Sequence, residues 1–407
     1  MASTPTDGRS RPLAAVFLAT FFVRFSFGIT IAVFFDYLTG QSGAFTTQQL
    51  GTPGLVSAMA PIGEFSTVLL SGVAADRWGR YPVLFGGMAA SAVVFLAVAS
   101  TRDVVALAAA NFVFGIASGA ILAASLAVVA DRSGADERGL EMGRFDAVNL
   151  SGWVGGFAFG FAALGTVPNR SLGEVFWVGA ATLGVGLVAA ALLLRGEPAV
   201  RRARSFSVAN VLRSAFRRTV LVVTLPWLAI YALLGAVLAY LAPATSGIDL
   251  PATYVAAAIG VGGGLLVLTQ PYFGRWADRV GRTRMMTVGA TGFTLVLLFA
   301  GLLIAVGHPW PILVGLGASA IPALAYGPAA LAALADLSAA LSRATTMAIY
   351  SLTISLGMFV GIVATSQLVA AFGSPGLYPF FAAVAAVIVA LTTVRVLEAR
   401  AATIPVR

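Results

Sequence analysis

The sequence contains no cysteine, no lysine and a single histidine, His308, among its 407 residues. Without cysteine the chain cannot form disulfides, carry out thiol chemistry or build a cysteine-ligated metal site. His308 falls in the expected outer loop between the spans at 285–306 and 311–335, a place that argues against a histidine-based metal site or a catalytic triad. We therefore expect no metal ion, no cofactor and no enzymatic activity.

Charged residues are scarce as well. They make up 10% of the chain, hydrophobic residues make up 59%, and the mean hydropathy is +0.94. In an ordinary soluble domain about a quarter of all residues are charged. This composition predicts an integral membrane protein that crosses the lipid bilayer many times.

Windows of about 20 apolar residues are long enough to cross a bilayer as a helix. Twelve such windows occur, at residues 13–38, 53–75, 83–100, 103–130, 145–165, 174–194, 219–245, 252–273, 285–306, 311–335, 345–371 and 376–396. They lack the period-2 alternation of a β-barrel, and a helix satisfies its own backbone hydrogen bonds in lipid. The sequence therefore predicts an all-α protein with twelve transmembrane helices.

The arginines set the orientation of these spans. Arg102 and Arg170 fall in outer loops and Arg24 falls within a span, whereas the other arginines lie in the N-terminal tail, the inner loops or the C-terminal end. The positive-inside rule then predicts a multi-pass protein of the cell (inner) membrane with both termini in the cytoplasm. The net charge of +9 is spread along that inner face, so we expect no nucleic-acid partner.

The chain carries an internal repeat. The stretch GVAADRWGRYPVLFGG, which begins at Gly72, recurs as GRWADRVGRTRMMTVG, which begins at Gly274. A second alignment, at an offset of 205 positions, sets Asp131, Gly152 and Gly156 against Asp336, Gly357 and Gly361. The repeat predicts two pseudo-symmetric six-helix halves, residues 1–194 and 219–407, joined by an Arg-rich cytoplasmic linker at residues 195–218.

The first of these stretches resembles the G-x-L-A-D-R-x-G-R signature of the major facilitator superfamily, and the second copy lies at the equivalent place in the second half. The stretch FGITIAVFFDYL at 27–38 is also similar to the twelve-span drug:proton antiporter families. The resemblance covers essentially the whole chain and implies the major facilitator fold, transport by alternating access, and a monomer. Two positions depart from it, since Asn111 and Gly152 stand where an arginine and a proline are common.

The resemblance also implies a cytoplasmic gate. Asp76 would contact the N-terminus of the span at 345–371, where the helix dipole favours a negative charge, and would form a charge relay with Arg80 and Asp131. The predicted gate residues of both halves are Gly72, Asp76, Arg77, Gly79, Arg80, Asp131, Asp278, Arg279, Arg282 and Asp336. The alternative is that these turns only set loop geometry and topology.

Two ionisable residues are expected near the middle of the membrane. Arg24 and Glu64 each lie about 12 residues from the inner end of their spans, or roughly 18 Å at a helical rise of about 1.5 Å per residue. A charge at that depth is a functional candidate by default. Glu64 is therefore predicted to carry protons, with Arg24 beside it and with Asp36 and Asp146 as further candidates. A permanent structural salt bridge between Arg24 and Glu64 is the alternative.

Aromatic side chains with few polar groups dominate the spans expected to line a cavity. The predicted cavity residues are Phe25, Asn111, Asn149, Trp153, Trp227, Tyr231, Tyr326 and Tyr350. Such a lining suits apolar or amphipathic ligands. We expect proton-coupled export of a small compound of this kind by antiport. Proton-coupled uptake of a sugar or organic anion by symport, lipid translocation and a non-transporting receptor are the alternatives.

Overall fold

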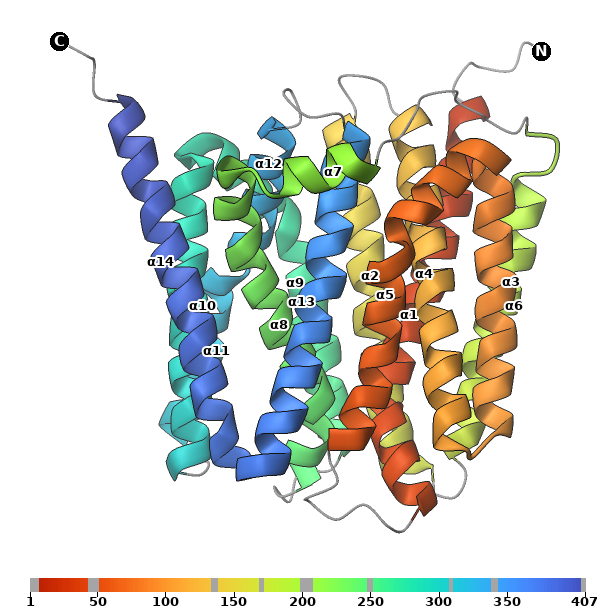
Figure 1. Cartoon of the computed structure of the whole chain (residues 1–407), viewed down its shortest axis with the longest axis horizontal. Helices are drawn as coiled ribbons and strands as arrows, with labels where there is room; N and C mark the ends of the chain where they lie inside the picture. The colour runs from red at the N-terminus through yellow and green to blue at the C-terminus, as the bar shows by residue number, and fades with distance from the viewer. Residues whose placement is uncertain are drawn as a thin grey trace. The chain divides into compact units, whose positions relative to one another are not determined.

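The computed structural model describes residues 7–42, 51–132, 138–167, 172–197, 208–246, 252–306, 310–337 and 343–403. Within these ranges all regular secondary structure is helical (Figure 1). The predicted all-α membrane fold is therefore confirmed.

Long helices follow one another along the chain. The first six are α1 (Asp7–Ser42), α2 (Gly51–Trp78), α3 (Arg80–Ser100), α4 (Val104–Arg132), α5 (Arg138–Thr166) and α6 (Leu172–Leu193). A short helix, α7 (Val208–Ala215), precedes α8 (Arg218–Ser246), α9 (Ala252–Val280), α10 (Arg282–Val306), α11 (Trp310–Ala323), α12 (Tyr326–Leu337) and α13 (Arg343–Phe372). A 3-10 turn, Ser374–Gly376, leads into α14 (Leu377–Thr403).

Eleven segments of the described residues are long and apolar enough to cross a membrane. They correspond to eleven of the twelve predicted spans. The predicted span at 252–273 coincides with α9, whose described apolar stretch, Gly260–Gln270, is shorter. The eleven segments make the chain an integral multi-pass membrane protein, and a twelfth crossing by α9 stays a prediction.

The chain divides into two compact units. Unit 1 comprises Met1–Phe45, Val56–Phe206 and Leu238–Val267, and unit 2 comprises Thr46–Leu55, Ser207–Val237 and Leu268–Arg407. Unit 1 thus includes a segment from the second half of the sequence, Leu238–Val267, and unit 2 includes a segment from the first half, Thr46–Leu55. The predicted boundaries at residues 194 and 219 follow the sequence repeat and stay a prediction.

Small residues bring α1 and α5 together in unit 1. A methyl group added at Gly156 would lie 2.1 Å from the carbonyl oxygen of Phe25, and one added at Gly152 would lie 2.6 Å from the carbonyl oxygen of Phe21. Such a separation is possible because glycine has no Cβ, so the two backbones touch. The Gly152-x-x-x-Gly156 spacing therefore fixes the register of α5 on α1.

The same arrangement recurs in unit 2 at the offset found in the sequence. A methyl group at Gly361 would lie 1.9 Å from the carbonyl oxygen of Ala232, and one at Gly357 would lie 2.6 Å from that of Leu228. These glycines of α13 approach α8 as Gly152 and Gly156 approach α1. The repeat is thus visible in backbone packing as well as in the charged turns.

The two charged turns also share their backbone geometry. Gly79, between α2 and α3, has φ 100°, and Gly281, between α9 and α10, has φ 101°. Residues with a side chain rarely adopt this conformation, whereas glycine does so at little cost. This is a physical reason why both copies of the motif carry a glycine at this position.

The span at 311–335 is interrupted. Its two parts, α11 and α12, are separated by Leu324 and Ala325, where the amide of Ala325 donates to the carbonyl of Pro322 at 3.1 Å. Pro328 has no amide hydrogen for the carbonyl of Leu324, and its ring clashes with a carbonyl four residues earlier in a regular helix. The break therefore follows from the sequence.

Candidate functional site

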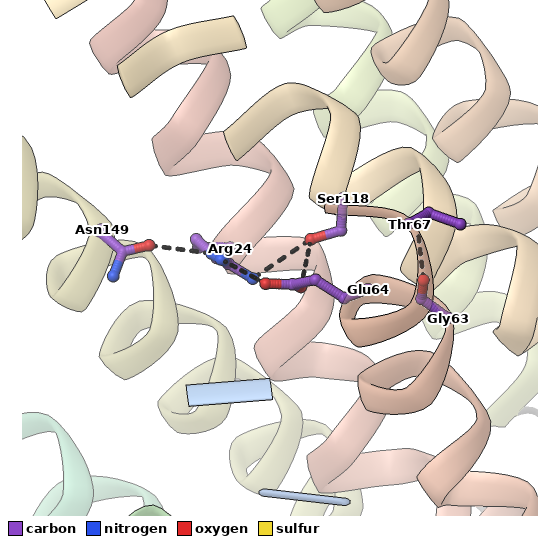
Figure 2. A network of polar contacts seen from close by, with 6 residues as sticks. All are labelled: Arg24, Gly63, Glu64, Thr67, Ser118 and Asn149. Carbon is purple, nitrogen blue, oxygen red and sulfur yellow. Dashed lines mark hydrogen bonds and ion pairs between the residues drawn. The ribbon is translucent and has the colours of Figure 1, made fainter. Parts of the chain in front are cut away.

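Four helices of unit 1 bring polar side chains together around Arg24 of α1 (Figure 2). Its guanidinium donates from Nη1 to Glu64 Oε2 of α2 at 3.0 Å and from Nη2 to Glu64 Oε1 at 3.1 Å, which makes a bidentate ion pair. It also donates from Nη1 to Ser118 Oγ of α4 at 3.2 Å and from Nε to Asn149 Oδ1 of α5 at 2.8 Å. Ser118 in turn donates to Glu64 Oε2 at 3.0 Å.

This network, Arg24, Glu64, Ser118 and Asn149, is almost completely buried. Arg24 and Glu64 are each 2% exposed. The Arg24 guanidinium carbon also lies 5.7 Å from the ring centroid of Phe27 and 5.7 Å from that of Trp153. A buried ion pair is tolerated when hydrogen bonds also satisfy its other donors and acceptors, and here Ser118 and Asn149 add such bonds. The network is therefore held from several sides.

Glycines of α4 explain how Glu64 and Ser118 meet. A methyl group at Gly115 would lie 2.0 Å from the carbonyl oxygen of Ala60, and one at Gly119 would lie 3.4 Å from Glu64 Cγ. The small residues let α4 lie directly against α2. The Gly115-x-x-x-Gly119 spacing is the sequence signal that could have indicated this contact between α4 and α2.

The other two candidates for proton coupling are Asp36 and Asp146. Asp36 lies in α1, and its side chain is outside the described residues. Asp146 lies in α5, half-buried, three residues before Asn149. Their roles stay predictions.

Asn111 has a structural role that its predicted place in the cavity did not anticipate. Its Nδ2 donates to the carbonyls of Val56 at 2.8 Å and Ser57 at 3.3 Å in α2. The carbonyl of Ser57 has no helical partner because the residue four positions later, Pro61, has no amide hydrogen. Asn111 therefore supplies the hydrogen bond that Pro61 removes.

The aromatic candidates of unit 1 pack along α1 and α5. Phe25 stacks on Phe21 with ring centroids 6.0 Å apart and lies 5.7 Å from Phe159. Trp153 lies 4.7 Å from Phe27 and 5.4 Å from Phe157. Trp153 thus joins the aromatic packing to the Arg24 network.

Unit 2 holds an aromatic cluster. The ring of Trp227 lies 5.2 Å from that of Tyr350 and 6.1 Å from that of Tyr231. Tyr326, the first residue of α12, is fully buried and lies 6.4 Å from Phe293. In the part of unit 2 that the structure describes, no charged side chain is classed as buried.

Charged residues also cluster in unit 1 where α2 and α4 end. Arg80 forms ion pairs with Asp131 at the end of α4 and, at 3.4 Å, with Asp76 at the end of α2. It also donates to the carbonyl of Ala127 at 2.7 Å. The predicted grouping of these three residues is therefore present. Gly72 lies in α2, and Arg77 is exposed near its end.

A further ion pair lies next to this cluster and was not predicted from the sequence. Arg132, the residue after Asp131, donates to Glu197 Oε2 at 2.8 Å and to Tyr81 Oη at 3.3 Å. Burial lowers the pKa of Arg132, but the hydrogen bonds to Tyr81 and Glu197 outweigh it and the pKa is raised overall. Arg132 therefore stays charged and ties the end of α4 to the chain that follows α6.

The equivalent cluster of unit 2 has the same pairs but is more open. Arg282 contacts Asp336 at 2.7 Å and Asp278 at 3.3 Å, and Arg279 is exposed beside them. The side chains of Arg282 and Asp336 are 33% and 57% exposed, whereas those of Arg80 and Asp131 are 6% and 9% exposed. Ion pairs weaken as exposure to water grows.

The two clusters should therefore respond differently to the same substitution. We expect Asp131→Asn to lower stability by about 2 kcal/mol, because it weakens a buried charged hydrogen bond. The matched Asp336→Asn should cost less than about 1 kcal/mol. Thermal unfolding of the two purified variants in one detergent measures the difference, and equal shifts would contradict this ranking.

Within the described residues, no group of three histidine, cysteine, aspartate or glutamate side chains is placed to hold a metal ion. The chemistry that this arrangement can perform is the binding and release of protons by carboxylates and the rearrangement of ion pairs.

Curated proteins similar to this chain include a multidrug resistance protein and two proteins named as transporters. Multidrug resistance protein 2 of Bacillus subtilis is 34% identical over 134 residues, 32% of this chain and 32% of that protein. The triacylglyceride transporter of Mycobacteroides abscessus is 27% identical over 176 residues, 43% and 34% of the two chains. The 3-(3-hydroxy-phenyl)propionate transporter of Escherichia coli is 28% identical over 195 residues, 48% and 46%. The matches thus span from about a third to just under half of these relatives.

Solved structures similar to this one share its architecture. The human organic anion transporter MFSD10 (TETRAN) aligns with a TM-score of 0.68 and 17% identity over 96% of this chain and 99% of that chain. A D-xylose-proton symporter aligns with a TM-score of 0.72 and 14% identity over 94% and 96%. At these identities the likeness shows the fold alone.

A sequence profile of the Major Facilitator Superfamily matches residues 16–268 and 248–405, which together cover nearly the whole chain. The match agrees with the helical architecture, the paired charged turns and the names of the relatives. The chain therefore belongs to the Major Facilitator Superfamily and is a membrane transporter, not an enzyme.

Proposed function

We propose that this transporter couples proton movement to the export of a small apolar or amphipathic compound by alternating access, with Glu64 as the proton carrier. The observation that carries the proposal is the buried network in which Glu64 is held by Arg24 and Ser118. Ionisable side chains are rare inside transmembrane helices and commonly mark ion pathways. Asp36 and Asp146 are secondary candidates for the same step.

The network gives proton binding a mechanical consequence. When Glu64 takes up a proton, its ion pair with Arg24 loses its negative charge, whereas Arg24 keeps its charge and its bonds to Asn149 and Ser118. The attraction that joins α2 to α1 then weakens while the α1 to α5 contact persists. The protonation state of one carboxylate thereby biases the packing of helices within unit 1.

The inner charge clusters are assigned to the cytoplasmic gate. Asp76, Arg80 and Asp131 in one unit and Asp278, Arg282 and Asp336 in the other occupy the two copies of the family motif. The arginine distribution supports cytoplasmic termini and an inner-membrane location. The family resemblance supports a monomer.

The substrate assignment is supported by the aromatic side chains and by one relative. Trp153, Trp227 and Tyr350 offer large apolar faces, and the Bacillus subtilis relative is named a multidrug resistance protein. The names of other relatives favour two further candidates. Uptake of an organic acid or sugar with a proton would agree with the propionate transporter and the xylose symporter, and lipid translocation would agree with the triacylglyceride transporter.

The test is substrate-driven proton movement in proteoliposomes, with the native protein compared with Glu64→Gln. Lipophilic cations, xylose and 3-(3-hydroxyphenyl)propionate serve as probes of the three substrate classes. Glu174→Gln is the matched control, since Glu174 is an exposed glutamate in the first turn of α6. We expect Glu64→Gln to lower substrate-driven proton flux at least about 100-fold, as for loss of a proton-transferring group.

The direction of the pH change separates the candidates. Proton release on the side from which the compound is taken up indicates exchange and supports export, whereas co-entry of proton and solute supports uptake. Full proton flux in Glu64→Gln would contradict the role of Glu64 and leave the Arg24 pair structural. A solute flux without any proton movement would remove proton coupling from the proposal.

A further inference from the structure

The linker between the two halves of the sequence contains a helix whose surface is divided into distinct faces. Helix α7, Val208–Ala215, lies crosswise at the ends of α8 and α13 (Figure 1). Val211 is fully buried and Ser214 is nearly so, and α7 contacts α13. One face of this short helix is therefore occupied by unit 2 itself.

The faces that point away from Val211 and Ser214 are exposed. Leu212 is 44% exposed and Phe216 is 75% exposed. The amide of Phe216 donates to the carbonyl of Leu212 at 3.2 Å, so the helical turn continues to Phe216 and the two side chains fall one turn apart. They form an apolar ridge that unit 2 leaves uncovered in the part the structure describes.

A basic ridge runs beside the apolar one. Arg213 and Arg217 are both exposed and are spaced four residues apart. Neither makes an ion pair with another described residue, whereas the next arginine, Arg218, pairs with Glu398 of α14 at 3.0 Å. Two guanidinium groups thus accompany two large apolar side chains on the open surface of α7.

We propose that α7 binds anionic phospholipid headgroups of the leaflet that faces the Arg-rich end of the protein. A helix that lies along a membrane surface buries apolar side chains at the level of the acyl chains and turns basic ones to the headgroups. Leu212 and Phe216 supply the apolar part, and Arg213 and Arg217 contact phosphate oxygens. Guanidinium groups suit phosphate because they can donate two parallel hydrogen bonds.

Charge selects the lipid. In a zwitterionic headgroup the negative charge of the phosphate is balanced by a cation of the same headgroup, whereas phosphatidylglycerol has no such cation and carries a net negative charge. Each arginine close to an anionic membrane surface raises affinity about fivefold, so two should give a preference of about 25-fold. Because α7 immediately precedes α8, the bound lipid holds the start of α8 at the membrane surface.

The test is native mass spectrometry of the full chain in detergent, titrated separately with phosphatidylglycerol and phosphatidylcholine. The native protein should bind phosphatidylglycerol about 25-fold more tightly, and Arg213→Gln/Arg217→Gln should lose most of that preference. Arg213→Lys/Arg217→Lys keeps both positive charges, so this variant should still prefer phosphatidylglycerol by at least about fivefold. Phe216→Ser should weaken binding of both lipids alike. Thermal unfolding verifies that each variant is folded.

The matched control is Arg275→Gln/Arg284→Gln, which removes the same charge from two exposed arginines of α9 and α10 in unit 2. This control should leave the lipid preference within about twofold of the native value, far from the 25-fold loss expected at α7. An equal loss in the control would overturn the proposal, because general positive charge would then explain the binding. An unchanged preference in the α7 variant, or displacement of the lipid by inorganic phosphate at equal concentration, would overturn it as well.

Discussion

Replacing Arg24 by glutamine is expected to destabilise the protein by about 3 kcal/mol or more at neutral pH. The substitution leaves the Glu64 carboxylate buried with Ser118 as its remaining partner in the network. A buried charge without a partner of opposite sign is far costlier than an exposed one. For a chain of this length, such a loss in the free energy of unfolding should lower the midpoint temperature of thermal unfolding by on the order of 5 °C.

The pH dependence of the stability of Arg24→Gln shows whether the loss comes from the unpaired charge of Glu64 or from lost side-chain packing. As the pH falls, Glu64 of Arg24→Gln takes up a proton and becomes neutral, so the deficit relative to the native protein should shrink. Glu64→Gln should show no such recovery, because the guanidinium of Arg24 stays charged at all accessible pH values. The double variant Arg24→Gln/Glu64→Gln should be more stable than Arg24→Gln at neutral pH. A deficit that is independent of pH would instead indicate lost packing.

The second large effect is expected at the contact between α1 and α5. Gly156→Ala places a methyl group 2.1 Å from the carbonyl oxygen of Phe25, a backbone atom that cannot move without shifting α1. We expect a cost of about 3 kcal/mol, at the upper end for overpacked cores. The shift should also disturb the Arg24 network, because α1 and α5 carry Arg24 and Asn149.

Gly184→Ala in α6 provides the matched control for this prediction. A methyl group there meets nothing within 4 Å, so the higher helix propensity of alanine should stabilise the protein by about 0.5–1 kcal/mol. Unfolding midpoints of the two variants in the same detergent should therefore move in opposite directions. A fall of similar size in both would mean that the close approach at Gly156 does not matter.

Much of the fold could be predicted because it depends on features that can be read directly along the sequence, namely the length of apolar segments, repeated motifs and prolines. Span length follows from bilayer thickness, and the paired turns repeat visibly at Gly79 and Gly281. The break after Ala323 follows from Pro322 and Pro328.

The site was harder to predict because apolar spans give no information about which face points inward. Depth along the helix placed Arg24 and Glu64 at one level, but their contact depends on helix rotation, which a uniformly apolar pattern leaves open. Glycine spacings carry that information. Gly115 and Gly119 set the face of α4 that meets Glu64, and Gly152 sets the face of α5 that meets Arg24.

The bond from Asn111 to the α2 backbone limits the order in which these positions can change during evolution. While Pro61 is present, loss of the Asn111 amide strands the carbonyl of Ser57 in a water-poor interior. If another residue replaces Pro61 first, its own amide hydrogen reaches that carbonyl and Asn111 becomes free to vary. Homologues that have no side-chain donor at the position of Asn111 should therefore lack the proline too, whereas a donor without the proline is permitted.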